Sequence, residues 1–410
     1  MSCSSAHRVD QHQILSRRRL LSGSAASLAL WGFVPRTLAG TRDPRLLAIV
    51  LRGGLDGLSM VAPVGDPDYE RVRKTLALKA EGTGAGLPLD GFFVLNPAMP
   101  FLHGLYRRNE ALAIHAVTTP YRGRSHFDGQ DVLESGLAGA GRTEDGWLNR
   151  ALARLDNAGR ANPKGLAMGA VVPLVMRGAA PVLSWIPNAY NIPLRDSTVA
   201  RLMDLYAETD PRLAKAFADG MAIDKVAGAG PLLAPQPKPK LAADAPPAKQ
   251  YREFTDAAVM AARFLAAADG PRIGALSYNG WDTHANEGVL QGQLANRLAG
   301  LDAAIHALAD GLGAAWKDMV VLLVTEFGRT VHVNGTEGTD HGTATVALLL
   351  GGAVKGGRVL ADWPGLAEKS LHESRDLRPT RDLRAVLKGV LRDHLAIPDG
   401  ALARTVFPGS

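Results

Sequence analysis

The 410-residue sequence is almost without cysteine, since Cys3 is the only one. A single thiol cannot form an intramolecular disulfide, and sites that need several thiolates, such as structural zinc or iron–sulfur centres, are excluded. The sequence also contains no Walker phosphate loop, no GxSxG nucleophile elbow and no HExxH zinc motif. Any catalytic or metal site must therefore be assembled from oxygen and imidazole groups spread along the chain.

Long apolar runs and dense basic segments are missing as well. Beyond the N-terminal region no segment reaches the roughly 20 apolar residues of a spanning helix, so we expect no membrane span in the mature form. The net charge of +6 is modest and no block of lysine and arginine suggests a nucleic-acid groove, so nucleic acid is not an expected partner. The 46% hydrophobic and 21% charged residues are typical of a globular protein with a substantial core.

The N-terminal region has the pattern of a targeting signal. Arginines at 17–19 precede an apolar stretch that ends near Val34, and Thr37 and Ala39 form a plausible cleavage site. Paired arginines before a mild apolar segment indicate twin-arginine export, with an ordinary secretory leader as the alternative. We expect residues 1–40 to be a signal recognised by the twin-arginine translocase, and the mature protein to be periplasmic or secreted.

Short apolar runs alternate with helical patterns along the rest of the chain. This alternation predicts an α/β fold with a mostly parallel central sheet and helices on both faces. We expect a single domain over 45–400, with a loop-rich insertion within 160–250 that includes a Pro/Ala-rich connector at 227–249. The expected strands are 46–51, 112–117, 171–176, 181–186, 273–278, 319–325 and 345–350, and the expected helices are 98–108, 125–133, 251–267, 288–312 and 381–395.

Carboxylate and imidazole side chains lie beside several of the expected strands. Asp282 and His284 follow 273–278, and their two-residue spacing allows both to face one ion. Open α/β sheets place their chemistry beyond the carboxyl ends of the strands. The other candidates next to strands are Glu326, Asp340 and His341. Oxygen and imidazole ligands without thiolates suit a hydrolytic metal centre.

Each of these candidates also has a purely structural explanation. Asp282 could cap a helix, and Asp340 could stabilise a turn. Glu326 could form a salt bridge with Arg329, which is close in sequence. We favour a shared site because residues of this kind recur on successive elements.

A second group of candidates surrounds the expected helix start at Ser125. A serine there lies near free backbone amides, where an anion is favoured, and it becomes a nucleophile once a base or a metal activates it. The alternative is that Ser125 only caps the helix. His126 is a catalytic candidate beside it, and Arg124 is a candidate for holding a phosphate or sulfate. Asp56, in the glycine-rich turn 52–57, is a further carboxylate, with an ordinary turn as its alternative.

Taken in order, these segments resemble the bacterial family known as domain of unknown function 1501. The resemblance covers nearly the whole mature chain. It rests on the twin-arginine leader and on Leu51-Arg52-Gly53-Gly54-Leu55-Asp56-Gly57, Arg124-Ser125-His126-Phe127-Asp128, Asp145-Gly146-Trp147-Leu148-Asn149, Trp281-Asp282-Thr283-His284, Glu326-Phe327-Gly328-Arg329-Thr330, Gly338-Thr339-Asp340-His341-Gly342, Gly351-Gly352 and Asp362-Trp363-Pro364-Gly365.

That family in turn resembles the alkaline phosphatase and sulfatase superfamily. The resemblance implies an alkaline-phosphatase-like fold, a nucleophilic Ser125, and a centre that binds a divalent metal such as zinc, calcium or manganese. The implied metal ligands are Asp56, Asp282, His284, Glu326 and His341, with the adjacent Asp340 as a further candidate. This chain has Glu326-Phe327 where the superfamily usually has Asp-His, so one metal ion is as compatible with the sequence as two.

The expected function is an exported, metal-dependent hydrolase that acts on a small or polymeric phosphate or sulfate ester. The metal would polarise the ester oxygen and lower the pKa of Ser125 or of a bound water. Arg124 or Arg329 would offset the negative charge that develops on the ester oxygens. The alternative is a non-catalytic exported protein of the same fold that binds an envelope polymer or a protein partner.

Overall fold

The computed structural model of this chain describes residues 42–155, 165–169, 171–185, 196–210 and 248–410, together with 214, 215 and 218. The expected leader at 1–40 and nearly all of the expected connector at 227–249 lie outside these residues. Within the described ranges, no helix combines the length and the apolar character of a membrane span. The extent expected for the domain, 45–400, remains a prediction.

A nine-stranded sheet forms the centre of the described part of the molecule. Its order is β11-β5-β10-β9-β1-β8-β6-β7, and β12 pairs with β5. The strands are β1 (Arg45–Arg52), β5 (Ala111–Thr118), β6 (Gly165–Met168), β7 (Val182–Trp185), β8 (Ile273–Asn279), β9 (Met319–Val324), β10 (Thr345–Leu350), β11 (Arg358–Leu360) and β12 (Arg381–Asp382). β10 is antiparallel to both of its neighbours, and the other pairings in this sheet are parallel. The expected α/β class with a mostly parallel sheet is confirmed.

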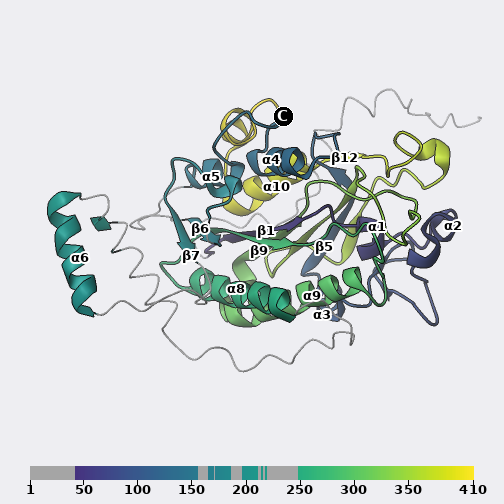
Figure 1. Cartoon of the computed structure of the whole chain (residues 1–410), viewed down its shortest axis with the longest axis horizontal. Coiled ribbons are helices and arrows are strands. Elements are labelled where there is room, and N and C mark those ends of the chain that lie inside the picture. The colour runs from purple at the N-terminus through teal and green to yellow at the C-terminus, as the bar shows by residue number, and fades with distance from the viewer. Residues whose placement is uncertain are drawn as a thin grey trace, which may run out of the picture.

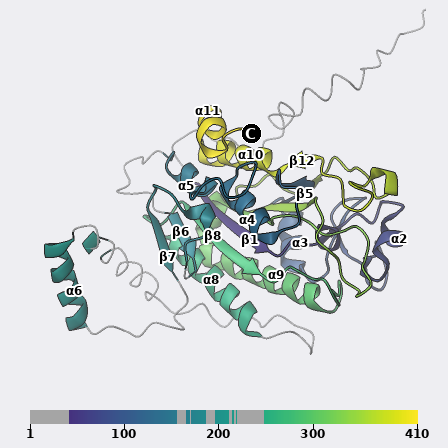
Figure 2. The ribbon, with the colours of Figure 1, turned by 45° about the horizontal axis from the view of Figure 1, so that its top comes forward.

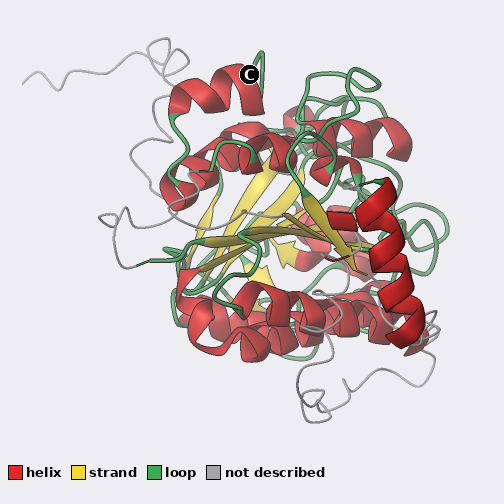
Figure 3. Cartoon of the chain, turned by 90° about the vertical axis from the view of Figure 1, so that its left-hand side faces the viewer, coloured by secondary structure: helices red, strands yellow, loops and turns green. Residues whose placement is uncertain are grey.

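The central strand β1 shows why the sheet is covered on both faces. Leu47 and Ile49 pack in one hydrophobic cluster with α3 (Pro100–Arg107), α8 (Ala248–Ala266) and α9 (Gln293–Leu312), whereas Leu46 and Ala48 pack in another with α5 (Trp147–Leu152) and α10 (Leu383–Leu395). Successive residues of a strand point to opposite faces, so a strand buried on both sides has an unbroken apolar sequence. Figures 1 and 3 show the two helix layers on opposite sides of the strands.

The helices fall into two layers and a group of peripheral elements (Figure 2). One face of the sheet is covered by α3 (Pro100–Arg107), α8 (Ala248–Ala266) and α9 (Gln293–Leu312), and the other by α4 (His126–Ser135), α5 (Trp147–Leu152) and α10 (Leu383–Leu395). The peripheral elements are α1 (Gly57–Met60), α2 (Tyr69–Arg73), α6 (Asp196–Thr209), α11 (Asp399–Ala401) and a small sheet of β2 (Val61–Ala62), β4 (Val94–Leu95) and β3 (Leu87–Pro88).

The reversed direction of β10 determines which loops meet at one edge of the sheet. Loops that follow the parallel strands β1, β5, β8 and β9 emerge at their carboxyl ends. The loop that precedes β10 reaches the same edge because this strand runs the other way. The candidate residues therefore converge there: Ser125 and His126 follow β5, Asp282 and His284 follow β8, Glu326 follows β9, and Asp340 and His341 precede β10.

Two of the expected elements differ in the structure. The expected strand at 171–176 is wrong: Leu174–Met176 forms a single 3-10 turn, and the strand of this region is β6, which lies earlier. The apolar side chains of Val175 and Met176 are buried against the α5 and α10 layer, so the apolar run reflects packing of a turn. The expected helix at 288–312 begins only at Gln293, because Gly288 and Gly292 adopt positive φ angles of 63° and 142°.

Candidate metal centre

Three histidines and one aspartate converge at this edge of the sheet. The Nε2 atoms of His126 and His341 are 3.0 Å apart, and those of His284 and His341 are also 3.0 Å apart. Oδ1 of Asp282 is 2.9 Å from His284 Nε2 and 3.1 Å from His341 Nε2, and its Oδ2 is 3.4 Å from His126 Nε2. We call these four residues the histidine–aspartate cluster.

The second ring nitrogen of each histidine in the cluster faces a hydrogen-bond acceptor. His126 Nδ1 lies 2.8 Å from Glu326 Oε1, and His284 Nδ1 lies 2.9 Å from Asp340 Oδ1. His341 Nδ1 lies 2.8 Å from the backbone carbonyl oxygen of residue 124. Histidines that bind metals almost always have their other ring nitrogen oriented in this way by a carboxylate or a carbonyl.

These partners determine what the inward nitrogens can do. Carboxylate and carbonyl oxygens only accept hydrogen bonds, so each imidazole can hold its proton on Nδ1 and direct a lone pair on Nε2 toward a bound cation. Without a cation, Asp282 can accept a hydrogen bond from His341 Nε2 instead. Lone pairs separated by 3.0 Å repel one another, and a cation between them converts this repulsion into coordination.

The donor atoms also have suitable spacing for a small transition-metal ion. A tetrahedral zinc ion with bonds of about 2.0–2.1 Å holds its ligand atoms about 3.3 Å apart. The five contacts named above span 2.9–3.4 Å, close to this value, and His126, Asp282 and His341 form a group whose ligand atoms all lie within 4.8 Å of one another. Imidazole nitrogens with a carboxylate oxygen favour zinc or a similar ion over calcium, which prefers oxygen ligands.

Glu326 lies behind the cluster and is fully buried. Its Oε1 accepts hydrogen bonds from the backbone N–H of Gly53 at 2.8 Å and from Gln130 Nε2 at 3.1 Å, in addition to His126. Thr325 donates to Oε2 at 2.9 Å. Burial alone would raise the pKa of this carboxyl, but the hydrogen bonds from His126, Gln130 and Gly53 lower it below its usual value. Glu326 is therefore ionised, and it orients His126 without facing the cluster centre itself.

Asp282 is held in place by the guanidinium of Arg329. Arg329 Nη1 donates to Asp282 Oδ1 at 2.6 Å, and its Nε donates to Thr339 Oγ1 at 3.1 Å. Burial opposes ionisation of Asp282, but hydrogen bonds from His341 and Arg329 lower its pKa well below the usual range. Arg329 itself is buried and engaged with these partners. Its side chain thus stabilises the ionised Asp282.

Asp56 belongs to a separate buried network. Its carboxylate pairs with Arg73, accepts a 2.7 Å hydrogen bond from Ser59, and caps α1 by accepting from Leu58 N. The network continues through Glu287, whose Oε2 accepts a 2.7 Å hydrogen bond from Thr339. The structure therefore does not bring Asp56 into the histidine–aspartate cluster.

Two carboxyl groups in this network differ in charge state. Burial and the neighbouring negative charge of Asp56 raise the pKa of Glu287 well above its usual value. Burial opposes ionisation of Asp56 too, but the charge of Arg73 and hydrogen bonds from Glu287 and Ser59 lower its pKa. Glu287 thus remains a neutral acid next to an ionised Asp56. The network joins the interior to the cluster, since Thr339 contacts both Glu287 and Arg329.

Ser125 and Arg124 directly precede His126 at the start of α4. The Ser125 hydroxyl caps α4 by accepting a 3.3 Å hydrogen bond from the backbone N–H of Asp128. The Arg124 side chain donates to Glu373 at 2.8 Å and lies 3.6 Å from Asp376, so its charge is directed away from the cluster. The contribution of residue 124 to the site is its backbone carbonyl, which orients His341.

The sequence predicted the residues of the cluster as candidates, but it did not predict the residues that contact and orient them. Gln130 and Glu287 were not among the candidates, although both contact candidate residues or their partners. Glu287 follows Asp282 and His284 in the same loop, and this proximity is the signal that could have identified it. Gln130 lies one helical turn after His126, so both can contact Glu326.

The matching family model is described as "Protein of unknown function (DUF1501)", and it matches residues 107–404. The chain belongs to this family. No curated protein matches the sequence. The family membership expected from the sequence is confirmed, and the family description assigns no activity.

Several solved structures are similar to this chain at low identity. One is murine ectonucleotide pyrophosphatase/phosphodiesterase 5, with 12% identity and a TM-score of 0.30, covering 70% of this chain and 57% of that one. Another is the phosphonate monoester hydrolase of Agrobacterium radiobacter, with 12% identity and a TM-score of 0.35, covering 78% and 70%. A third is an alkaline phosphatase superfamily protein from Vibrio parahaemolyticus, with 11% identity and a TM-score of 0.35, covering 85% and 72%. This chain spans less than two thirds of the murine protein. Identities and TM-scores this low do not identify the residues of the site.

Proposed function

We propose that this protein is an exported hydrolase that uses one divalent metal ion, zinc or a similar transition ion, to cleave phosphate or sulfate esters. The observation that supports the proposal most strongly is the histidine–aspartate cluster. His126, Asp282 and His341 offer ligand atoms within 4.8 Å of one another, His284 contacts Asp282 and His341 beside them, and each imidazole is oriented by an acceptor on its other nitrogen. Histidines whose outer ring nitrogens are held by carboxylate or carbonyl acceptors are typical of a metal site.

The centre is accessible from solvent, as a hydrolytic site requires. The side chains of Asp282 and His284 are 40% and 45% exposed, whereas Glu326 behind them is fully enclosed. When bound, the metal supplies Lewis acidity to the ester oxygen and lowers the pKa of a nearby hydroxyl or water. The exposed side of the cluster is where an ester could approach.

The start of α4 favours an anion beside the cluster. This helix begins at His126, and the N–H groups of its first turn have no acceptor within the helix. Together with the helix dipole they attract negative charge such as a phosphate or sulfate group. Ser125 immediately precedes this turn, so its hydroxyl is the candidate nucleophile, and a water is the alternative.

The proposal is tested by metal content and turnover measured on the same preparations. We expect about one equivalent of zinc or a similar ion in the exported wild-type protein, and turnover of at least one of an aryl phosphate, a phosphodiester and an aryl sulfate. His284→Ala and His126→Ala should lose most of the metal and the turnover. His306→Ala is a matched control, because His306 lies on α9 and contacts Asp310 and Phe101, remote in the fold from the cluster.

Further variants separate the possible roles. Ser125→Ala should retain the metal, and it should lose turnover if the hydroxyl is the nucleophile. Wild-type protein that contains no metal, with a melting temperature unchanged by chelator or zinc, would contradict the proposal. Stoichiometric metal without turnover of any ester would favour the alternative, a non-catalytic binding protein of the same fold. Export is tested by replacing Arg17 and Arg18 with lysine, which should retain the precursor in the cytoplasm.

A further inference from the structure

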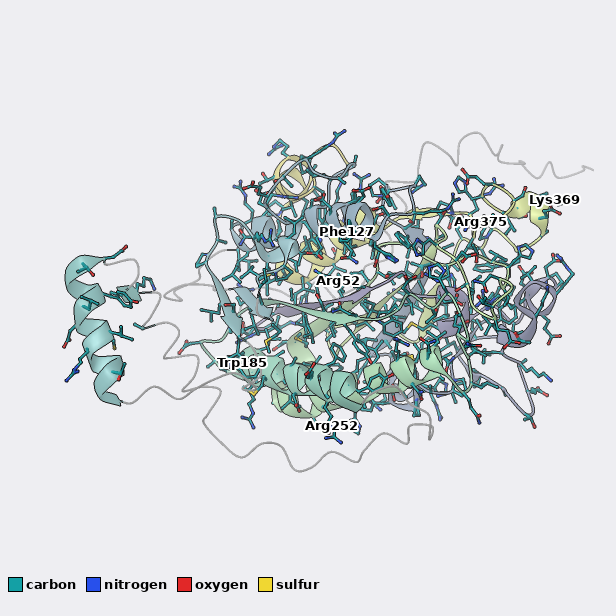
Figure 4. The ribbon with its side chains drawn as sticks, viewed as in Figure 1. Arg52, Phe127, Trp185, Arg252, Lys369 and Arg375 are labelled. Carbon is teal, nitrogen blue, oxygen red and sulfur yellow. The ribbon has the colours of Figure 1, made fainter. Side chains whose placement is uncertain are left out.

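A groove lies beside the histidine–aspartate cluster, at the carboxyl ends of β1, β8 and β6. Its volume is about 470 Å³, within the range of about 300–1,000 Å³ that is common for small-molecule sites. The groove is lined on one side by α4 and on the other by the segment that follows β6. Arg52, at the end of β1, and Phe127, on α4, both line it, and Figure 4 shows them at the middle of the molecule.

Helix α4 connects the groove to the cluster. Phe127, Gln130, Asp131 and Glu134 line the groove, and their spacing places them on one face of the helix. His126, one residue before Phe127, belongs to the cluster, and Gln130 donates to Glu326, which orients His126. One turn of α4 therefore separates the cluster from the groove, so a single ligand could contact both.

The groove contains an aromatic ring that is unusually open to solvent. Phe127 is 88% exposed, and Val171 on the opposite wall is 70% exposed. Large apolar side chains are rarely this exposed without a partner, and exposed aromatic rings are frequent in binding sites. The ring of Phe127 offers a flat apolar surface on which a ligand in the groove can stack.

The polar residues of the groove are balanced in charge. Arg52 forms an ion pair with Glu134, and Arg177 and Asp131 contribute one further charge of each sign. Amide groups of Gln130 and Asn279 add donors and acceptors. A balanced lining attracts no net charge. Its mixture of donors and acceptors beside apolar side chains instead suits a neutral molecule that has many hydroxyl groups and apolar ring faces.

We infer that this groove binds the sugar ring of a carbohydrate sulfate or phosphate ester whose anionic group lies at the histidine–aspartate cluster. The inference rests on the proposed function and specifies its substrate class. The ring stacks on Phe127, and its hydroxyls bond to Asp131 and to the amide of Gln130. The anionic group is thereby directed toward the start of α4.

Binding of sugar esters to the full-length mature protein tests this inference directly. The probes are the 6-sulfates and 6-phosphates of glucose, galactose, mannose and N-acetylglucosamine, with ethyl phosphate and inorganic sulfate as ligands without a ring. Saturation-transfer NMR should show contacts to the ring protons of at least one sugar ester. Phe127→Ala should raise its Kd about three- to tenfold, the range expected for loss of a stacking contact. Phe127→Trp should restore binding, and the Kd values of the ligands without a ring should not change.

The control variant is Leu290→Ala, which removes another exposed apolar side chain outside the groove. It should leave every Kd unchanged. The inference is overturned if no sugar ester gives ring-proton contacts, or if Phe127→Ala leaves its Kd unchanged. Failure of the inference is distinguishable from failure of the proposed function. Aryl-ester turnover with no sugar binding contradicts only the groove assignment, whereas Phe127-dependent sugar binding without metal or turnover contradicts only the hydrolase.

Discussion

At the scale of single residues, the candidate site is organised by the acceptor that fixes the outer ring nitrogen of each histidine. The inward nitrogens of the cluster could coordinate an ion only if their rings are fixed in one orientation, and Glu326, Asp340 and the carbonyl of residue 124 provide this. Glu326 is the extreme case, because it is fully buried and remains ionised through its hydrogen bonds. Its role in this geometry is to position His126.

Glu326→Gln tests that positioning role. The amide retains the shape and can still accept from His126, but it loses the negative charge that makes the imidazole a better ligand. We expect metal affinity to fall about 10- to 100-fold, the range typical for partners of metal-binding histidines. Competition with a chromogenic chelator measures the affinity. Asp310→Asn, on the surface of α9, is the control, and an unchanged affinity in Glu326→Gln would show that Glu326 does not act through His126.

At the scale of elements, the sequence predicted the strands and helices that are long and strongly apolar, and it missed those that depend on context. The buried strands β1, β9 and β10 are continuous apolar runs, so their prediction was correct. β6 has only four residues and begins with glycine, whereas the apolar run after it is buried as a turn. Local patterns report burial, but they do not distinguish a buried turn from a buried strand.

The candidate site was likewise predictable only in part. The residue types and their positions beside strands indicated Asp282, His284 and His341. The pattern could not show that Arg73 pairs with Asp56, because they are joined only in the folded chain. Nor could it show which ring nitrogen of His126 faces Glu326 and which faces the cluster. These features depend on side-chain orientation across separate elements, and no spacing within one element encodes it.

The contact between α3 and α9 includes one buried carboxyl group, that of Asp302. It accepts hydrogen bonds from Phe101 N at 3.0 Å and Leu102 N at 2.8 Å, in the first turn of α3. Burial raises its pKa to about 6 in spite of these bonds. Because the folded-state pKa lies above the unfolded value, this group destabilises the fold when ionised, and stability increases as the pH falls through 6 toward 4.

Asp302→Asn removes the titrating group and keeps one of the two acceptor oxygens, so its stability should vary less with pH than that of wild type. Relative to wild type, the variant should be more stable at pH 8 than at pH 4, by about 1–3 kcal/mol. Urea unfolding of chelator-treated proteins at both pH values measures it. Asp302→Ala should instead lose about 1–3 kcal/mol, because two backbone donors lose their acceptor. Equal stability of wild type and Asp302→Asn at both pH values would contradict a raised pKa of the Asp302 carboxyl in the folded state.

At the scale of the whole molecule, the described core contains histidines that are buried in the neutral form. His115, on β5, and His394, at the end of α10, are almost fully enclosed, and burial lowers the pKa of each to about 4. Their ring nitrogens bond to the backbone carbonyls of Val61 and Arg45, which joins the sheet to flanking elements. Protonation favours the unfolded chain, where their pKa is near 6.5.

The contribution of these two histidines to stability should be fully present above pH 6.5 and should decrease as the pH falls from 6.5 toward 4, opposite in direction to that of Asp302. Each histidine should account for about 2 kcal/mol at pH 5. Urea unfolding at pH 7.5 and pH 5, with chelator present, measures the decrease. His394→Gln removes the titrating group and keeps a donor for the carbonyl of Arg45, so its stability should vary less with pH than that of wild type. The same pH dependence in both proteins would exclude His394 as a cause.

The antiparallel course of β10 has a practical consequence for labelling the protein. The turn that follows this strand, 351–357, emerges at the rim opposite the cluster, where it bonds to Glu110 and Trp316 before β5 and β9. Lys355 is exposed in this turn. A fluorophore or a surface tether attached there would leave the rim with the histidine–aspartate cluster facing outward, whereas lengthening the 327–344 loop on the other side of the same strand would displace His341 itself.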